Sequence, residues 1–121
     1  METINHECYV SLEVAKLLED AGFDWECREH YPSNFIAYQY EDYTKPTLDV
    51  AQRWLREVKN ISVDISSTNS SNWEYVIRKI NQLNHKDNTI LVLTACKFYT
   101  YEEAQEAGIK KALEIILEKG E

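Results

Sequence analysis

The sequence predicts a single α+β domain over residues 1–121, with three helices and a mostly antiparallel sheet of about five strands in the order α-β-β-α-β-β-β-α. Three segments begin with a helix-capping residue and then repeat apolar side chains at helical spacing, whereas the stretches between them alternate with a period of two. With 121 residues and 44% apolar composition, the chain can bury a core without disulfides or a metal. Short connections favour antiparallel pairing of neighbouring strands.

The first helix is expected within residues 11–23. Ser11 can accept a hydrogen bond from a free N–H at the helix start, and Gly22 suits the left-handed position that follows a helix end. Phe23 can then fold back on Leu18, as in a Schellman motif. The buried stripe of this helix consists of Val14, Leu17, Leu18 and Ala21.

A hairpin is expected after this helix, with strands at Trp25–His30 and Asn34–Tyr40 and a turn at residues 31–33. The second helix should begin after Pro46, with Thr47 as its N-cap, and should stop at Asn60. Its apolar face is formed by Ala51, Trp54, Leu55 and Val58.

Three more strands are expected before the last helix. Ile61 to Ile65 alternates apolar and polar side chains, which is typical of a strand buried on one face. The polar residues 66–72 predict a loop, and Trp73–Ile80 and Thr89–Tyr99 predict two strands joined through residues 81–88.

The third helix should begin with a capping box, in which Thr100 and Glu103 satisfy each other's backbone N–H groups. Acidic side chains come early and lysines late, as the helix dipole favours. Ala104, Gly108, Ala112, Ile115 and Ile116 line one side, and Ile109, Leu113 and Leu117 widen the apolar arc. This arc is broader than packing on one sheet face requires.

The charge balance bears on possible partners. The chain has 21 acidic and 13 basic side chains, a net charge of −8, and its longest basic cluster is the pair Lys110 and Lys111. This argues against binding to nucleic acid or to an anionic membrane surface. No apolar run is long enough to span a membrane, and no signal peptide is recognisable. Together with three widely spaced cysteines, these features predict a cytoplasmic protein.

The histidine and cysteine side chains form no convincing metal or catalytic site. His6, Cys8, Cys27 and His30 could in principle bind zinc, but Cys27 and His30 would point to opposite faces of a strand. Cys96 lies in an apolar run and His85 in a polar loop. We therefore expect no catalytic residue, no cofactor and no metal site, and the sequence indicates that the protein is not an enzyme.

The capped segments resemble a known group of proteins. Tyr9–Leu18 with Ala21–Phe23, Pro46–Thr47 with Ala51–Val58, and Tyr101–Ala107 resemble a family of short uncharacterised proteins encoded by phages, prophages and mobile elements of anaerobic gut bacteria. The resemblance covers the three helices and implies a mobile-element origin, but it implies no activity and no site residues. The first helix is also similar to the opening of winged-helix excisionases, although the following residues favour a strand over a recognition helix.

The leading functional hypothesis is a protein-interaction module that binds an unknown protein or a second copy of itself. Its expected surface combines a tyrosine-rich hairpin with the apolar flank of the third helix, because exposed aromatic and apolar patches are typical of interfaces. The candidate residues are Tyr31, Tyr38, Tyr40, Tyr43, Ile109, Leu113 and Leu117. Two alternatives stay open: an acidic nucleic-acid mimic that inhibits a host protein, and an excisionase-like DNA-binding accessory protein.

Overall fold

The computed structural model describes residues 8–31, 43–68, 72–80, 89–93 and 98–118. Along the chain lie α1 (Leu12–Asp20), β1 (His30–Tyr31), β2 (Tyr43–Thr44), α2 (Leu48–Val58), β3 (Ile61–Ser67), β4 (Trp73–Lys79), β5 (Thr89–Leu93) and α3 (Tyr101–Glu118). The α+β class, with three helices and an antiparallel sheet, is confirmed. A single five-stranded sheet is not found in this part of the chain, since β1 pairs only with β2 and β3-β4-β5 form a separate sheet.

All three helices start where their caps predict. The Ser11 hydroxyl accepts a hydrogen bond from the N–H of Val14, and the Thr47 hydroxyl accepts one from Val50, each at 3.2 Å. At the start of α3, the N–H of Glu103 donates to the Thr100 hydroxyl (3.0 Å). The Glu103 carboxylate in turn accepts from the N–H of Thr100 (3.3 Å), which completes the capping box.

The first two helices also end as predicted. Gly22 has a φ of +99°, and the N–H of Phe23 donates to the carbonyl of Leu18 (2.9 Å), which is the Schellman bond. The N–H of Gly22 donates to Glu19 (3.0 Å). Asn60, directly after the C-cap of α2, has a φ of +59°, a conformation that Asn tolerates better than most residues.

The predicted strand at Trp25–His30 is wrong for its first five residues, which form neither strand nor helix. Its partner, predicted at Asn34–Tyr40, lies outside the described residues; His30–Tyr31 pairs instead with Tyr43–Thr44. The Trp25 ring lies 6.3 Å from the Phe23 ring, and the Arg53 guanidinium of α2 lies 5.3 Å above it. Trp25 therefore packs against Phe23 and Arg53 and does not belong to a strand.

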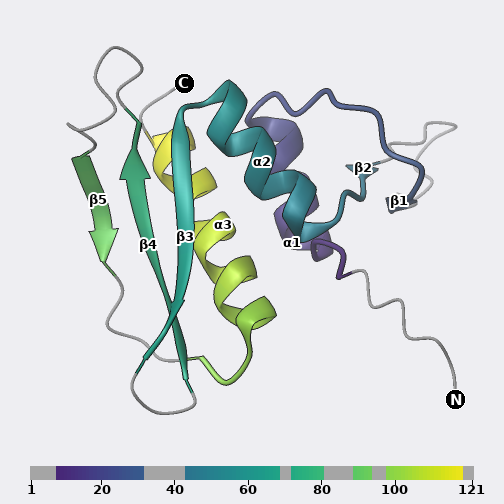
Figure 1. Ribbon diagram of the computed structural model, residues 1–121. Helices are drawn as coiled ribbons and strands as arrows, with labels where there is room; N and C mark the ends of the chain where they lie inside the picture. The colour runs from purple at the N-terminus through teal and green to yellow at the C-terminus, as the bar shows by residue number, and fades with distance from the viewer. Residues whose placement is uncertain (1–7, 32–42, 69–71, 81–88, 94–97, 119–121) are drawn as a thin grey trace, which may run out of the picture.

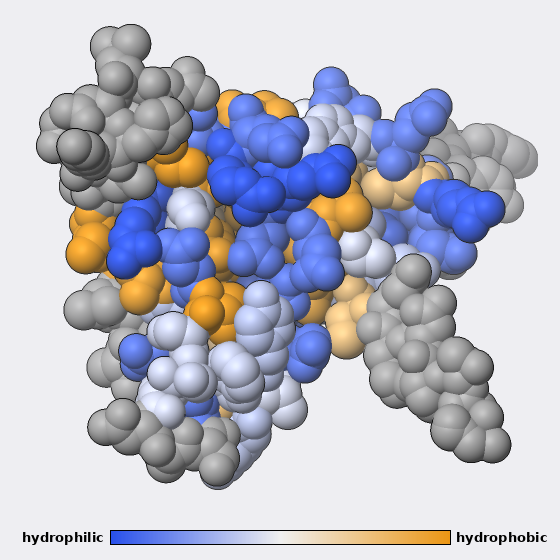
Figure 2. Space-filling model, in the orientation of Figure 1, coloured by the Kyte–Doolittle hydropathy of each residue, from blue (hydrophilic) through white to orange (hydrophobic). Residues whose placement is uncertain are grey.

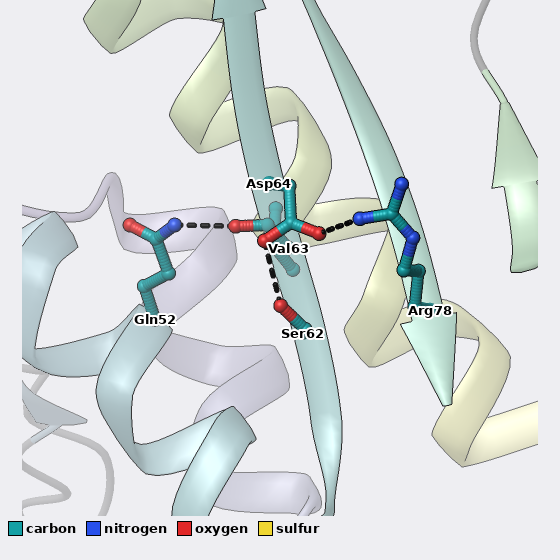
Figure 3. Close-up of polar contacts among 5 residues, drawn as sticks. All are labelled: Gln52, Ser62, Val63, Asp64 and Arg78. Carbon is teal, nitrogen blue, oxygen red and sulfur yellow. Dashed lines mark hydrogen bonds and ion pairs between the residues drawn. The ribbon is translucent and has the colours of Figure 1, made fainter. Parts of the chain in front are cut away.

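Figure 1 shows the arrangement of the layers: α3 packs on β3 and β4 from behind, β5 lies at the edge away from the helices, and α1 and α2 lie beyond β3. The sheet is antiparallel throughout, with Val63 of β3 opposite Ile77 of β4. At the β3 edge, the Gln52 side chain of α2 donates to the backbone carbonyl of Val63 (Figure 3). A helix and a side-chain amide therefore cover an edge that could otherwise pair with another strand.

The predicted apolar flank of α3 is corrected by the structure. Ile109 and Leu113 are both fully buried, at 0% exposure, and Leu117 is half-buried. The reason is that α3 contacts β3 and β4 as well as α1 and α2. The wide apolar arc of α3 packs against the sheet on one side and against α1 and α2 on the other. Ile109 and Leu113 are therefore buried and do not form an interaction surface.

The sheet face turned away from α3 is largely polar. Ser62 donates to the Asp64 carboxylate (2.7 Å), and Arg78 of β4 forms an ion pair with the other oxygen of the same carboxylate (Figure 3). Figure 2 shows hydrophilic side chains over much of this face, with hydrophobic ones scattered among them. This pattern is ordinary for an antiparallel sheet with one solvated face.

Candidate functional site

The tyrosine cluster expected on the hairpin is only partly visible. Tyr38 and Tyr40 lie outside the described residues. Tyr31 pairs with Tyr43 across β1 and β2, and the half-buried Tyr43 packs against the core with Lys16 5.9 Å from its ring centroid. The tyrosine surface therefore stays a prediction.

The cysteine and histidine residues do not assemble within the described part of the chain. There, no three His, Cys, Asp or Glu side chains gather as a metal site requires. Nε2 of His30 lies 3.2 Å from the backbone carbonyl of Cys27, whereas the Cys27 thiol donates to the backbone carbonyl of Trp25 at 3.7 Å. Burial raises the pKa of the Cys27 thiol, which disfavours the reactive thiolate. His6, His85 and Cys96 lie outside the described residues.

A groove of about 800 Å³ lies between the segment before α1, the start of α2 and the first half of α3. Its apolar parts come from Leu48, Phe98 and Ala107, flanked by the rings of Tyr9 and Tyr99. Tyr99 is 83% exposed, so this aromatic ring stands in solvent at the rim. The complete lining is Cys8, Tyr9, Leu48, Phe98, Tyr99, Glu102, Glu103, Glu106 and Ala107.

Backbone hydrogen bonds hold the walls of this groove in place. The N–H of Leu48 donates to the carbonyl of Cys8 (2.8 Å), and the N–H of Val10 donates to that of Pro46 (3.0 Å). On the other wall, Phe98 exchanges two 2.8 Å backbone bonds with Trp73. The groove is therefore built on secondary structure and its caps, which is the rigid support that a binding site needs.

Three carboxylates form the acidic rim of the groove. Glu103 accepts from the N–H groups of Tyr99 (3.1 Å) and Thr100 (3.3 Å), and Glu106 accepts from the N–H of Ser11 at the start of α1 (3.3 Å). These donors are neutral peptide groups. They orient the carboxylates but leave their negative charge in place.

A smaller pocket of about 340 Å³ continues from the groove, sharing Cys8, Leu48 and Glu102 with it. Its other lining residues are Thr47, Asp49, Tyr101 and Gln105. The pKa of Tyr101 is raised by burial and by the negative charges of Asp49 and Glu102. The pocket therefore has a negative potential.

A buried amide fixes one side of the smaller pocket. Gln105, only 2% exposed, donates through Nε2 to Asp49 Oδ1 (2.7 Å) and to Gln52 Oε1 (2.8 Å). Gln52 in turn donates to Val63 of β3. This polar chain joins α3, α2 and the sheet edge, and it holds Asp49 at the pocket wall.

Sequence reasoning missed this groove, since its residues come from three distant parts of the chain. One signal was present: Gln105 stands four residues before Ile109 and eight before Leu113, on their buried face. A polar residue at such a position indicates a buried hydrogen-bond network.

Comparison with protein-family models, with curated proteins and with solved structures found no match for this chain. No helix in the described residues is long and apolar enough to cross a membrane.

Proposed function

We propose that the protein is a non-catalytic interaction module, of phage or mobile-element origin and acting in the cytoplasm, which holds a segment of a partner protein in the groove. The observation that carries the proposal is the groove itself, with apolar walls at Leu48 and Phe98 and an exposed aromatic rim at Tyr99. Aromatic side chains around an apolar centre are typical of protein interfaces.

An enzymatic role has less support at this site. The described lining residues of the groove include no His, Lys or Arg, and no contact of the Cys8 thiol with a basic group is seen among the described residues. A cysteine nucleophile needs such a group to form its thiolate. The groove can bind, but it offers no described pair of residues for nucleophilic chemistry.

The acidic-mimic hypothesis is a second candidate, favoured by the net charge of −8. A mimic would bind a basic host protein mainly through carboxylates, and added salt would weaken that binding steeply. The DNA-binding alternative gains no support from the described residues, because the segment after α1, residues 23–29, contains no helix that could enter a groove of DNA.

The proposal is tested by selecting random peptides displayed on phage against the folded protein. Binding of the selected peptides is then measured on Tyr99→Ala and on Val58→Ala. Val58 is a matched control, since it is an apolar residue, 47% exposed, at the opposite end of α2 from Leu48. We expect Tyr99→Ala to weaken binding about tenfold, as loss of an interface aromatic does, and Val58→Ala to leave it unchanged. Peptides that bind both variants like the wild type would refute the groove as the binding site.

A further inference from the structure

We infer that the partner segment carries a lysine or arginine side chain that enters the smaller pocket between Asp49 and Glu102, beside bulky apolar side chains that lie on Phe98 and Ala107. This inference rests on the proposed function and adds the chemistry of the partner. It follows from three features: the groove carboxylates form no ion pair among the described residues, carboxylates from two helices line the smaller pocket, and the nearby lysines do not line it.

The carboxylates at the groove form no ion pair within the described part of the chain, although Lys110 interacts electrostatically with Glu106. Asp49, Glu102, Glu103 and Glu106 line the groove or its smaller pocket, and none of them forms an ion pair with a described Lys, Arg or His. The hydrogen bonds found for Asp49, Glu103 and Glu106 come from a side-chain amide and from peptide N–H groups, which are neutral. A cation in the groove would therefore meet three carboxylates, those of Asp49, Glu103 and Glu106, that are already oriented.

The smaller pocket offers the better place for that cation. Asp49 comes from α2 and Glu102 from α3, so carboxylates on two different helices line one pocket of about 340 Å³. Tyr101, which also lines the pocket, adds an aromatic side chain against which a cation can lie. Charge interactions are stronger beside apolar walls such as Leu48 than in open water.

Two lysines, Lys45 and Lys110, lie near the groove without lining it. Lys45 Nζ lies 5.1 Å from the centroid of the Tyr9 ring, at the far wall of the groove, and Lys110 Nζ is paired with Glu13 at 3.0 Å. Neither lysine lines the groove or the smaller pocket. An incoming positive charge is attracted to the carboxylates of Asp49 and Glu102, whose pocket neither lysine lines.

The apolar part of the groove indicates that the partner segment also carries apolar side chains. A purely basic segment would leave the half-buried Phe98 and Ala107 in contact with water. A segment that places an apolar side chain beside its cation covers these walls as well, and apolar burial contributes about 25 cal/mol per Å². The groove therefore fits a mixed basic and apolar segment better than it fits the purely basic surface that a nucleic-acid mimic would bind.

The test uses the peptides selected on the wild-type protein that lose binding to Tyr99→Ala. Each lysine or arginine in these peptides is replaced, arginine by citrulline and lysine by norleucine, which removes the charge while nearly keeping the shape. We expect one such replacement to raise Kd about tenfold. On the protein side, Glu102→Lys should raise Kd about tenfold, whereas Glu118→Lys, the same charge change on an exposed residue at the last position of α3, should change it less than about twofold.

The possible failures are distinguishable. If no selected peptide depends on Tyr99, the proposed function fails and the inference with it. If Tyr99-dependent peptides contain no basic residue, or keep their affinity after the replacements and on Glu102→Lys, the groove binds protein but the inference is wrong. Circular dichroism of each variant confirms that a loss of binding is not a loss of folding.

Discussion

Gly108 of α3 lies directly against Val63 and Tyr75 of the sheet, and replacing it with alanine tests the packing described above. A Cβ atom at this position would lie 2.6 Å from Val63 Cγ1 and 3.1 Å from Tyr75 Cβ and Cγ. Favourable carbon contacts occur at about 3.5–4.0 Å, so the first of these distances is a clash with a side chain that is only 2% exposed.

Two opposing effects set the magnitude. Alanine is more favourable than glycine inside a helix by about 1 kcal/mol. Overpacking a tight core costs about 1–3 kcal/mol, and the short contact with Val63 places Gly108→Ala near the upper end of that range. We therefore expect Gly108→Ala to lower the free energy of unfolding by about 1–2 kcal/mol.

The cause is isolated by a double-mutant cycle with Val63→Ala, which removes the methyl group that the new Cβ meets. Val63→Ala alone should cost about 2 kcal/mol as a large-to-small core change. The double variant should be more stable than the sum of the two single changes implies, by about 1 kcal/mol, because the clash is gone. The contacts with Tyr75 at 3.1 Å remain, so the rescue is incomplete.

The assay is urea unfolding followed by tryptophan fluorescence and circular dichroism, with equal m-values required for comparison. Ala107→Gly, one position earlier in α3, measures the helix-propensity effect separately. The reasoning is refuted if Gly108→Ala stabilises the protein by the propensity value, or if the two substitutions are additive within about 0.5 kcal/mol.

Three further predictions concern the groove and the thiols. Gln105→Leu should lower the free energy of unfolding by about 1–3 kcal/mol in the same urea assay, because Asp49 and Gln52 lose a donor, and an unchanged stability would show that the buried network is unimportant. Tyr101 has a pKa raised above its ordinary 10.0, so its stabilising contribution is complete below pH 10 and is lost as pH rises through the folded-state pKa. The wild type should accordingly lose more stability between pH 10 and 11 than Tyr101→Phe does in thermal unfolding, and parallel curves would contradict this. Cys27 has a pKa raised above 9.0 by burial, so iodoacetamide at pH 8 should alkylate it more slowly than it alkylates a free cysteine peptide, as measured by mass spectrometry; an equal rate would contradict the burial.

The helix boundaries could be predicted because they depend on neighbouring residues. Ser11, Thr47 and Thr100 each cap a helix through a bond to an N–H three residues later, and Gly22 ends α1 by its own backbone conformation. Such short-range chemistry is visible in the sequence without knowledge of the fold.

Features that depend on distant residues could not be predicted in the same way. The apolar arc of α3 is evident from the sequence, but only the fold shows that α3 packs on α1 and α2 as well as on the sheet and that Ile109 and Leu113 are buried. Tryptophan is enriched in strands, yet the ring of Trp25 packs beside Phe23 and under Arg53, outside any strand. The groove joins Cys8 to Phe98 across most of the chain, so no local pattern predicts it.

The central claim, that the groove with its acidic rim is the binding site, is tested most directly by NMR. The backbone amides of the ¹⁵N-labelled protein would be recorded during titration with a selected peptide that carries a basic residue. The account predicts shift changes centred on Tyr9, Leu48, Glu102 and Ala107, and little change at Ser62 and Arg78 on the solvated sheet face. Shift changes centred on that sheet face, with the groove amides unmoved, would contradict it.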